Sequence, residues 1–259
     1  MTYDRRAPTR TRSMKRLLCV MALVAALPAS AAELTVSAAS SLTETFRDIA
    51  GAYEAANPGA KVDLNFAASG VLLQQIARGA PVDVLAAADT ATMDQAAKQG
   101  LLESNSRQTF ATNALIVVVP PGRRNAPKTL AALAGKGVQR VAIGNPDSVP
   151  VGRYARTALQ DAGLWQAFTA KTITTQNVRQ SLDYVARGEV DAGFVYASDH
   201  QAMPGRVVRA FDVPLKSPIT YPLSVIKDSA RAAEGRRFAA FVMSPQGQAI
   251  LRRHGFGAP

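Results

Sequence analysis

The stretch LTVSAASSLTETFRDIA, residues 34–50, joins two patterns that together indicate an α/β fold. Residues 34–36 form a short apolar and β-branched run, which is typical of a strand. From Leu42 onward the apolar side chains recur at the spacing of a helix that buries one face. Ser40 and Ser41 stand between the two patterns. Their hydroxyls could cap the helix, act as a nucleophile or contribute to a binding site.

The same alternation of strand-like and helix-like segments continues along the chain, which predicts an α/β protein with largely parallel sheets. Further strands are expected at residues 62–66, 82–86, 115–119, 140–143, 171–174, 192–196, 207–211 and 219–226. Helical patterns occupy residues 69–78, 91–99, 130–133, 153–162, 178–186, 231–242 and 245–253. The pattern restarts at residue 115 after the polar stretch 103–112. Because no Pro/Gly/Ser-rich linker precedes it, we expect two α/β units that are joined closely by extended strands, with a ligand in the cleft between them.

The N-terminal residues 1–32 are predicted to be a secretory signal peptide. A basic segment precedes the apolar run 17–27, which is too short to span a bilayer as a membrane anchor would. A second possible start is Met14. The single cysteine, Cys19, follows Leu18, whereas a lipoprotein signal requires a small residue there. We therefore expect an exported chain without a lipid anchor.

The composition excludes several classes of protein. Of 259 residues, 47% are hydrophobic and 19% are charged, so the chain can bury a core and is not disordered. The formal net charge of +11 falls when the signal peptide is removed. The remaining positive charge is scattered, without the clustered basic and aromatic face of a nucleic-acid-binding protein. Without the signal peptide the chain has no cysteine, which suits folding in an oxidising compartment without disulfides.

Four predicted helix starts share an uncharged character. A helix N-terminus has unpaired backbone N–H groups and a partial positive charge, and serine hydroxyls add further donors. Several such ends that converge on one cleft would suit a small, fully deprotonated oxyanion. The four segments are Ala39-Ser40-Ser41, Ala67-Ala68-Ser69-Gly70, Val149-Pro150-Val151-Gly152 and Gln176-Asn177-Val178.

Each of these segments also has an ordinary structural interpretation. Ser41 and Glu44 fit the capping box S-x-x-E, in which the serine only satisfies its own helix. Ser69 is in a typical capping position. Pro150 is favoured as a first helical residue, and Asn177 is a common N-cap. Taken singly, a cap is the better interpretation of each serine.

Catalysis has weak support in the sequence. A serine hydrolase that used Ser41 or Ser69 is the alternative from another functional class. It would require a G-x-S-x-G nucleophile elbow and a histidine base, but the elbow is absent and the only histidines, His200 and His254, are isolated. His200 follows Ser198-Asp199 in a segment that is predicted to be a polar loop. No phosphate-binding loop, dinucleotide fingerprint or transition-metal spacing is present. We expect a protein that is not an enzyme.

In chain order, the motifs resemble those of the periplasmic molybdate-binding proteins of bacterial ABC importers over essentially the whole chain after the signal peptide. The matching segments are AASSLTETFRDIA, NFAASGVLLQQI, GAPVDVLAAAD, GNPDSVPVGRYA, QNVRQSLDYVARGEVDAGFVYASD and YPLSVI. The resemblance implies the two-lobed fold of class II periplasmic binding proteins, with two strands that cross between the lobes and the ligand in the cleft. It places residues 33–112 and 221–259 in the first lobe and residues 113–220 in the second.

The resemblance also implies a ligand shell of uncharged donors. Ser41 and Ser69 would donate hydroxyl and backbone N–H groups from the first lobe. Val151 and Val178 would donate backbone N–H groups from the second lobe, and the Tyr196 hydroxyl would complete the shell. Val151 replaces an expected alanine, which a backbone donor tolerates. No cofactor and no direct metal-ion ligand is expected, because the metal arrives as the molybdate oxyanion.

The function implied is binding of molybdate, and of the similar tungstate, in the periplasm for delivery to the membrane permease of an ABC importer. Molybdate carries no proton at neutral pH and needs only donors, whereas phosphate keeps a proton and favours an acceptor. Sulfate is also fully deprotonated, so a binding protein for sulfate, thiosulfate or another tetrahedral oxyanion is the alternative within the same class. A monomer is expected.

Overall fold

Two five-stranded sheets form the framework of the computed structural model, which describes residues 1–3 and 32–259. In the first sheet, β1 pairs in parallel with β2 and β3, whereas β10 runs antiparallel to β3 and β4. The order across this sheet is β2 (Ala60–Ala67), β1 (Ala32–Ala39), β3 (Val84–Ala86), β10 (Ile219–Val225) and β4 (Gln108–Asn113).

The second sheet has the same plan. β6 pairs in parallel with β7 and β8, and β5 runs antiparallel to β8 and β9. Each sheet therefore consists of three parallel strands followed by two strands of mixed direction on one side. The order across the second sheet is β7 (Thr172–Thr175), β6 (Val141–Gly144), β8 (Ala192–Tyr196), β5 (Leu115–Val119) and β9 (Val208–Asp212).

The chain crosses between the sheets twice. β4 of the first sheet leads through Ala114 alone into β5 of the second, and β9 of the second leads through residues 213–218 into β10 of the first. The two crossing segments lie side by side, because β4 pairs with β10 and β5 pairs with β9. This confirms the predicted α/β fold of two lobes joined by two crossing strands. Below, the first lobe is the first sheet with its helices, and the second lobe is the second sheet with its helices.

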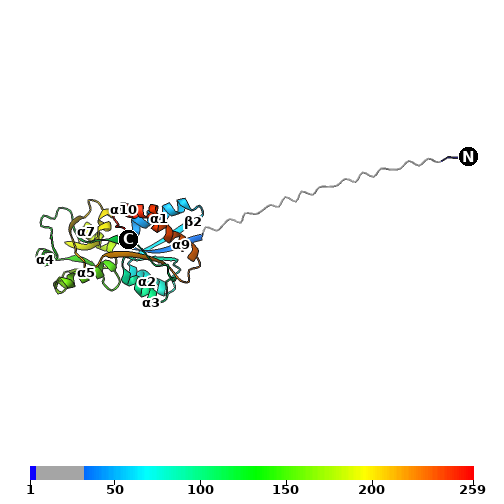
Figure 1. Cartoon of the computed structure of the whole chain (residues 1–259). Coiled ribbons are helices and arrows are strands. Elements are labelled where there is room, and N and C mark those ends of the chain that lie inside the picture. Colours follow the sequence, from blue (N-terminus) through cyan, green and yellow to red (C-terminus); the bar gives the residue numbers. More distant parts are fainter. Residues whose placement is uncertain (4–31) are drawn as a thin grey trace. The chain divides into compact units, whose positions relative to one another are not determined.

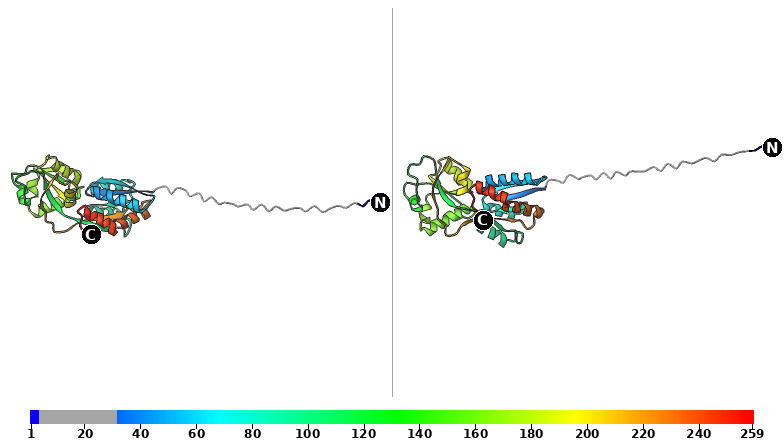
Figure 2. Two further views of the ribbon diagram at one scale, coloured as in Figure 1. Left: turned by 90° about the horizontal axis from the view of Figure 1, so that it is seen from above. Right: turned by 45° about the horizontal axis from the view of Figure 1, so that its top comes forward.

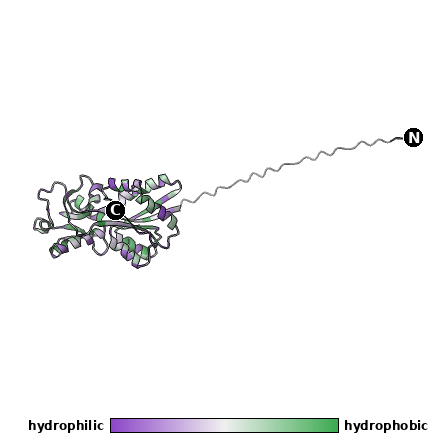
Figure 3. Cartoon of the chain, viewed as in Figure 1, coloured by the Kyte–Doolittle hydropathy of each residue, from purple (hydrophilic) through white to green (hydrophobic). Residues whose placement is uncertain are grey.

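Helices cover both sheets, as Figures 1 and 2 show. Those of the first lobe are the 3₁₀ turn η1 (Ser40–Leu42), α1 (Thr43–Ala56), α2 (Ser69–Ala77), α3 (Thr90–Lys98), α9 (Ala232–Met243) and α10 (Pro245–Arg253). Those of the second lobe are α4 (Leu130–Ala134), α5 (Pro150–Asp161), α6 (Trp165–Phe168), α7 (Val178–Ala186) and α8 (Ala197–Ala202). Along the helices, hydrophobic and hydrophilic residues alternate, as expected where one face packs on a sheet (Figure 3).

The alternation of side chains along β3 shows that the first sheet is buried on both faces. Val84 and Ala86 belong to the large hydrophobic cluster that includes Phe46 of α1. Leu85, between them, belongs instead to a second cluster with Met93 of α3. The first lobe is therefore a three-layer structure, and its parallel strands end at the edge where the helices begin.

Three segments differ from the prediction made from the sequence, and one of them is the four-residue helix α6, which was not predicted. The polar stretch 103–112 contains most of β4, an edge strand that pairs only with β10 in the described sheet. Because only Phe110 and Ala111 of this strand are buried, it has too few apolar residues to produce a periodic signal. His200 lies in the short helix α8 rather than in a loop. A helix of six residues is too short to show helical periodicity.

The N-terminal prediction lies almost wholly outside the described residues. The structure describes only residues 1–3 and 32 of the predicted signal peptide, so that assignment, with Met14 as a second start, stays a prediction. Within residues 1–3 and 32–259, no helix is long and apolar enough to cross a membrane.

Candidate functional site

The carboxyl ends of the parallel strands carry the predicted site residues. Ser41 follows β1 and Ser69 follows β2 in the first lobe. In the second lobe, Val151 follows β6, Val178 follows β7 and Tyr196 ends β8. Because neighbouring parallel strands end at the same edge of a sheet, each lobe brings its helix starts together there.

These helix starts surround one small pocket between the lobes. It has about 180 Å³ of empty volume, part of which is open to solvent, and all five predicted site residues line it. None of the lining residues is charged. The others are Ala39, Ser40, Ala67, Ala68, Ala88, Val149 and Pro150. The structure thus brings the predicted set together, while its role in ligand binding stays a prediction.

Ser41 does not form the capping box with Glu44. The N-cap position of α1 is Leu42, which makes no side-chain cap hydrogen bond. The Ser41 hydroxyl instead lies 3.0 Å from the hydroxyl of Tyr221 on β10. The Glu44 carboxylate is 2.6 Å from the guanidinium of Arg179 in the second lobe. Both residues of the apparent capping motif are therefore used in long-range contacts.

Ser69 is likewise not a side-chain cap. It is the first residue of α2, whose N-cap is Ala68. Its hydroxyl oxygen accepts a hydrogen bond of 3.0 Å from the backbone N–H of Ala88, which follows β3. The Ser69 proton is consequently available to a second partner.

The helix starts of the second lobe present backbone donors. Pro150 is the first residue of α5, which therefore begins three residues before the predicted start at residue 153 and agrees with the ordinary structural interpretation of this proline. Asn177 caps α7 by accepting a hydrogen bond of 2.9 Å from the N–H of Gln180. The N–H groups of Val151 and Val178 lie in the first turns of these helices, where no intrahelical acceptor exists. They are suited to an anion in the pocket.

Tyr196 supplies a buried polar atom without a partner. Its side chain is 1% exposed, and its hydroxyl oxygen has no hydrogen-bond partner among the described residues. Burial, reinforced by the neighbouring Tyr221, raises the pKa of the Tyr196 hydroxyl well above its ordinary value. The hydroxyl therefore stays protonated and can donate. An unsatisfied buried hydroxyl is costly unless a ligand satisfies it.

Besides the Glu44–Arg179 pair, two contacts hold the two lobes against each other around the pocket. The Gly70 N–H of α2 donates to the Ser148 carbonyl at 3.0 Å. A Cβ atom on Gly70 would lie only 2.6 Å from that carbonyl oxygen, so glycine permits this close approach. Arg153 pairs with Asp89 at 2.7 Å on one side of the pocket.

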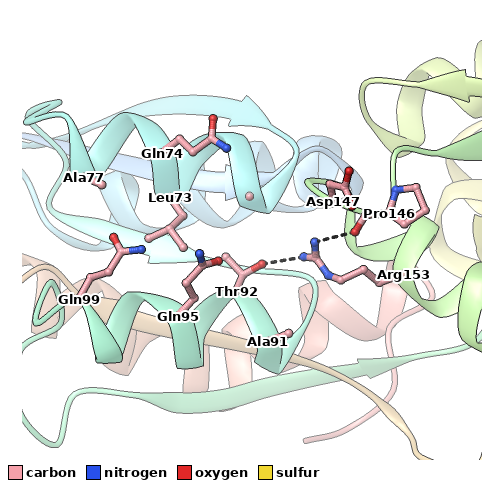
Figure 4. Close-up of a pocket in the computed structure, with 11 residues that line it drawn as sticks. Leu73, Gln74, Ala77, Ala91, Thr92, Gln95, Gln99, Pro146, Asp147 and Arg153 are labelled. Atoms are coloured by element: carbon pink, nitrogen blue, oxygen red, sulfur yellow. Dashed lines mark hydrogen bonds between the residues drawn. The ribbon is translucent and has the colours of Figure 1, made fainter.

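A larger pocket adjoins the Arg153 contact (Figure 4). Arg153 also donates to the Thr92 hydroxyl and to the Pro146 carbonyl, at 2.9 Å and 3.3 Å. This pocket has about 710 Å³ of empty volume, and its wall includes the long amides Gln74, Gln95 and Gln99. Its wall also includes the charged side chains of Asp147 and Arg153, whereas the wall of the smaller pocket is uncharged and contains all five predicted site residues. The smaller pocket is therefore the candidate binding site.

Catalytic and metal chemistry are not supported by the arrangement. Within residues 32–259, the hydrogen bonds of the Ser41 and Ser69 hydroxyls go to Tyr221 and Ala88 and not to a histidine. His254 contacts Asp48 at 2.8 Å. No group of three or more His, Cys, Asp or Glu side chains in the described ranges is arranged to hold a metal ion.

Reasoning from the sequence missed the residues behind the pocket and between the lobes. These are Tyr221, Asn113, Asp89, Arg153 and Arg179. The two arginines follow second-lobe donor positions by one or two residues, which was a usable signal. For Tyr221 the only signal was the YPLSVI motif, which does not indicate its partner.

The chain matches the family described as bacterial extracellular solute-binding protein over residues 34–257. It belongs to that family. This solute-binding protein is 35% identical over 231 residues to the molybdate-binding protein ModA of Escherichia coli (strain K12), covering 86% of this chain and 88% of ModA. It is 34% identical over 230 residues to ModA of Mycobacterium tuberculosis (strain H37Rv), covering 88% and 86%.

A solved relative has the same architecture. The periplasmic molybdate-binding protein of Azotobacter vinelandii superposes with a TM-score of 0.78 at 28% identity, covering 87% of this chain and 99% of that one. The members of this family bind solutes and are not enzymes. The solute-binding protein is therefore not an enzyme, as the missing nucleophile elbow and base indicated.

Proposed function

We propose that this solute-binding protein binds molybdate, and also tungstate, outside the cytoplasm and delivers it to the membrane permease of an ABC importer. Export to the periplasm through a cleavable signal peptide is part of the proposal. The relatives named above are molybdate-binding proteins and cover nearly the whole chain after the N-terminal region. The chemistry of the pocket gives independent support.

The observation that carries the proposal is the unpartnered Tyr196 hydroxyl in an uncharged pocket. It would donate to an anion together with the hydroxyls of Ser41 and Ser69 and the N–H groups of Val151 and Val178. Charge-assisted hydrogen bonds from neutral donors are strong in a buried site, and no formal positive charge is then needed.

The uncharged lining favours an anion that carries no proton. Hydrogen phosphate needs an acceptor for its remaining proton, and the lining contains no carboxylate. Molybdate, tungstate and sulfate need donors only. The similarity to molybdate-binding proteins supports molybdate over sulfate, and the size of the closed pocket would provide the discrimination.

Binding would stabilise the contact between the lobes. Each lobe contributes part of the donor set, so an anion can satisfy all the donors only when the lobes are together. The Gly70–Ser148 and Arg153–Asp89 contacts would form in the same step. The permease would then recognise the closed form.

Thermal unfolding in the presence of separate oxyanions tests this function. A ligand of the native state raises stability by RT ln(1 + [L]/Kd), about 4 kcal/mol when its concentration is 1,000 times Kd. Molybdate and tungstate are expected to raise the melting temperature, whereas phosphate and nitrate are not. A shift with sulfate and none with molybdate would refute the proposal in favour of a sulfate-binding protein.

Two variants test the residues. Ser41→Ala and Tyr196→Phe each delete one hydroxyl donor, and each is expected to raise the molybdate Kd about 10-fold or more, measured by calorimetry. Unchanged affinity in both variants would mean that the ligand lies elsewhere.

A further inference from the structure

Tyr221 is a buried tyrosine whose hydroxyl lies behind the pocket rather than in it. Its side chain is 0% exposed, and it does not line the pocket. Two polar groups contact its hydroxyl oxygen: the Ser41 hydroxyl at 3.0 Å and the Asn113 side-chain nitrogen at 3.4 Å. Burial raises the pKa of the Tyr221 hydroxyl well above its ordinary value, so the oxygen keeps its proton.

The orientation of the Asn113 amide is fixed by its own contacts. Its oxygen accepts from the N–H of Ala114 at 2.9 Å, and its nitrogen donates to the Ser198 hydroxyl at 2.9 Å. The nitrogen therefore faces Tyr221 and can only donate to it. Asn113 ends β4, so it lies where the chain crosses between the lobes.

This arrangement gives the hydrogen bonds one direction. The Tyr221 oxygen accepts from Asn113, and its proton has the Ser41 oxygen as its acceptor among the described residues. If Ser41 donated to Tyr221 instead, the buried Tyr221 proton would have no partner, which is unfavourable. Tyr221 therefore donates to Ser41, and the Ser41 proton is left to point into the pocket.

Ser69 shows the same pattern through a different donor. Its oxygen accepts from the backbone N–H of Ala88, a group that can only donate. The Ser41 and Ser69 hydroxyl oxygens thus each accept a hydrogen bond from a group of the first lobe, the Tyr221 hydroxyl and the Ala88 N–H. Each has its single proton available for the pocket.

We propose that Tyr221, held by Asn113, is a positioning residue that makes Ser41 an obligate donor and so excludes oxyanions that carry a proton. The inference rests on the proposed oxyanion-binding function and adds a cause for its specificity. Hydrogen phosphate or hydrogen arsenate would direct its O–H toward the Ser41 oxygen, and accepting that O–H would turn the Ser41 proton away from the anion and leave it without an acceptor among the described residues. A fully deprotonated anion meets donors only.

The test measures selectivity in Tyr221→Phe, which deletes the donor and keeps the ring. Molybdate is titrated by calorimetry at pH 8, and hydrogen phosphate and hydrogen arsenate are measured as competitors. Freed from Tyr221, Ser41 can rotate and accept. The preference for molybdate over hydrogen phosphate is expected to fall about 10-fold or more, since a hydrogen bond to a charged group is involved.

A double-mutant cycle separates positioning from a general structural effect. In the Ser41→Ala background, Tyr221→Phe is expected to leave the preference unchanged, because the hydrogen bond to Ser41 is already gone and phenylalanine keeps the ring contact with Tyr196. The matched control is Tyr53→Phe, which deletes another buried first-lobe hydroxyl, one that donates to Glu234 away from the pocket. It is expected to leave the preference unchanged.

The outcomes distinguish the two proposals. If wild-type protein binds no fully deprotonated oxyanion, the proposed function fails. If wild-type protein binds molybdate but Tyr221→Phe weakens all anions by the same factor, the function stands and the positioning role is refuted. The same effect of Tyr221→Phe with and without Ser41 would also refute that role.

Discussion

The two walls of the pocket are built on the same sheet plan but are completed by different chemistry. The first lobe presents the hydroxyls of Ser41 and Ser69, with the neutral Tyr221 and a backbone N–H behind them. The second lobe presents two helix starts with aliphatic side chains, and Tyr196.

Behind the second-lobe wall lies a carboxylate. The Tyr196 backbone N–H donates to Asp199 at 3.0 Å, and the Asp199 side chain is fully buried. Equivalent strand ends can therefore supply anion donors either from side chains or from the backbone alone. The difference determines which donors a mutation can remove and where a change of pH acts.

The largest expected effect concerns the charge behind the second wall. Burial raises the Asp199 pKa from 3.8 to about 6, although Arg179 opposes this. The folded state therefore binds this proton more tightly than the unfolded state. Protonated Asp199 therefore contributes to the free energy of unfolding at low pH. This contribution, about 3 kcal/mol in total, is lost as pH rises from about 4 through about 6.

Urea unfolding at pH 4.5 and pH 7.5 checks this expectation. Asp199→Asn is expected to remove most of the decrease in the free energy of unfolding between pH 4.5 and pH 7.5. Asp63→Asn, at an exposed site, is expected to keep that decrease. If wild-type protein and Asp199→Asn show the same pH dependence of stability, Asp199 is not its source, and the proposed difference between the two walls in their response to pH is refuted.

The next largest effect separates backbone donors from side chains. Val178→Pro deletes the N–H at the first position of α7, where proline is favoured, and the extended Asn177 (φ −162°, ψ 170°) tolerates a following proline. The molybdate Kd is expected to rise about 10- to 100-fold through loss of one hydrogen bond to the anion.

Val178→Ala is the control for this substitution. It keeps the N–H and shortens the side chain, so calorimetry is expected to show a Kd within about 3-fold of wild type. Equal losses in both variants would assign the effect to the side chain and would make the two walls chemically alike.

The smallest effects come from the ion pairs that join the walls. Between the lobes, Arg153 contacts Asp89, which is buried, whereas Arg179 contacts Glu44, which is 41% exposed. The buried Asp199, 3.9 Å from Arg179, belongs to the same lobe as Arg179 and does not join the walls. A buried carboxylate that loses its partner costs more than an exposed one. Arg153→Met is expected to raise the molybdate dissociation rate about 10-fold, and Arg179→Met only about 2-fold, in stopped-flow displacement.

Salt sharpens this last comparison. The exposed pair is screened by added salt more than the buried one. The wild-type rate is therefore expected to change little between low and high salt if the Arg153 contact dominates. A larger effect of Arg179→Met than of Arg153→Met would reverse the proposed importance of the two contacts.

Much of this protein follows from its sequence. The short apolar runs and the helical spacing after Leu42 predicted the α/β fold, and the resemblance to molybdate-binding proteins indicated five residues that line the pocket. Strand β4 and the helices α6 and α8 were missed, because an edge strand with two buried residues and helices of four and six residues leave no periodic pattern.

Only the tertiary structure decided what the serines do. In sequence, Ser41 and Glu44 match a capping box, so each would find its hydrogen-bond partner within the first turn of the same helix. In the fold, Ser41 meets Tyr221, 180 residues away, and Glu44 meets Arg179, 135 residues away. Periodicity and capping depend on neighbours within a turn, and a sequence displays these directly. Partners that are brought together by the packing of two sheets and two lobes depend on the whole fold, so a local motif cannot reveal them.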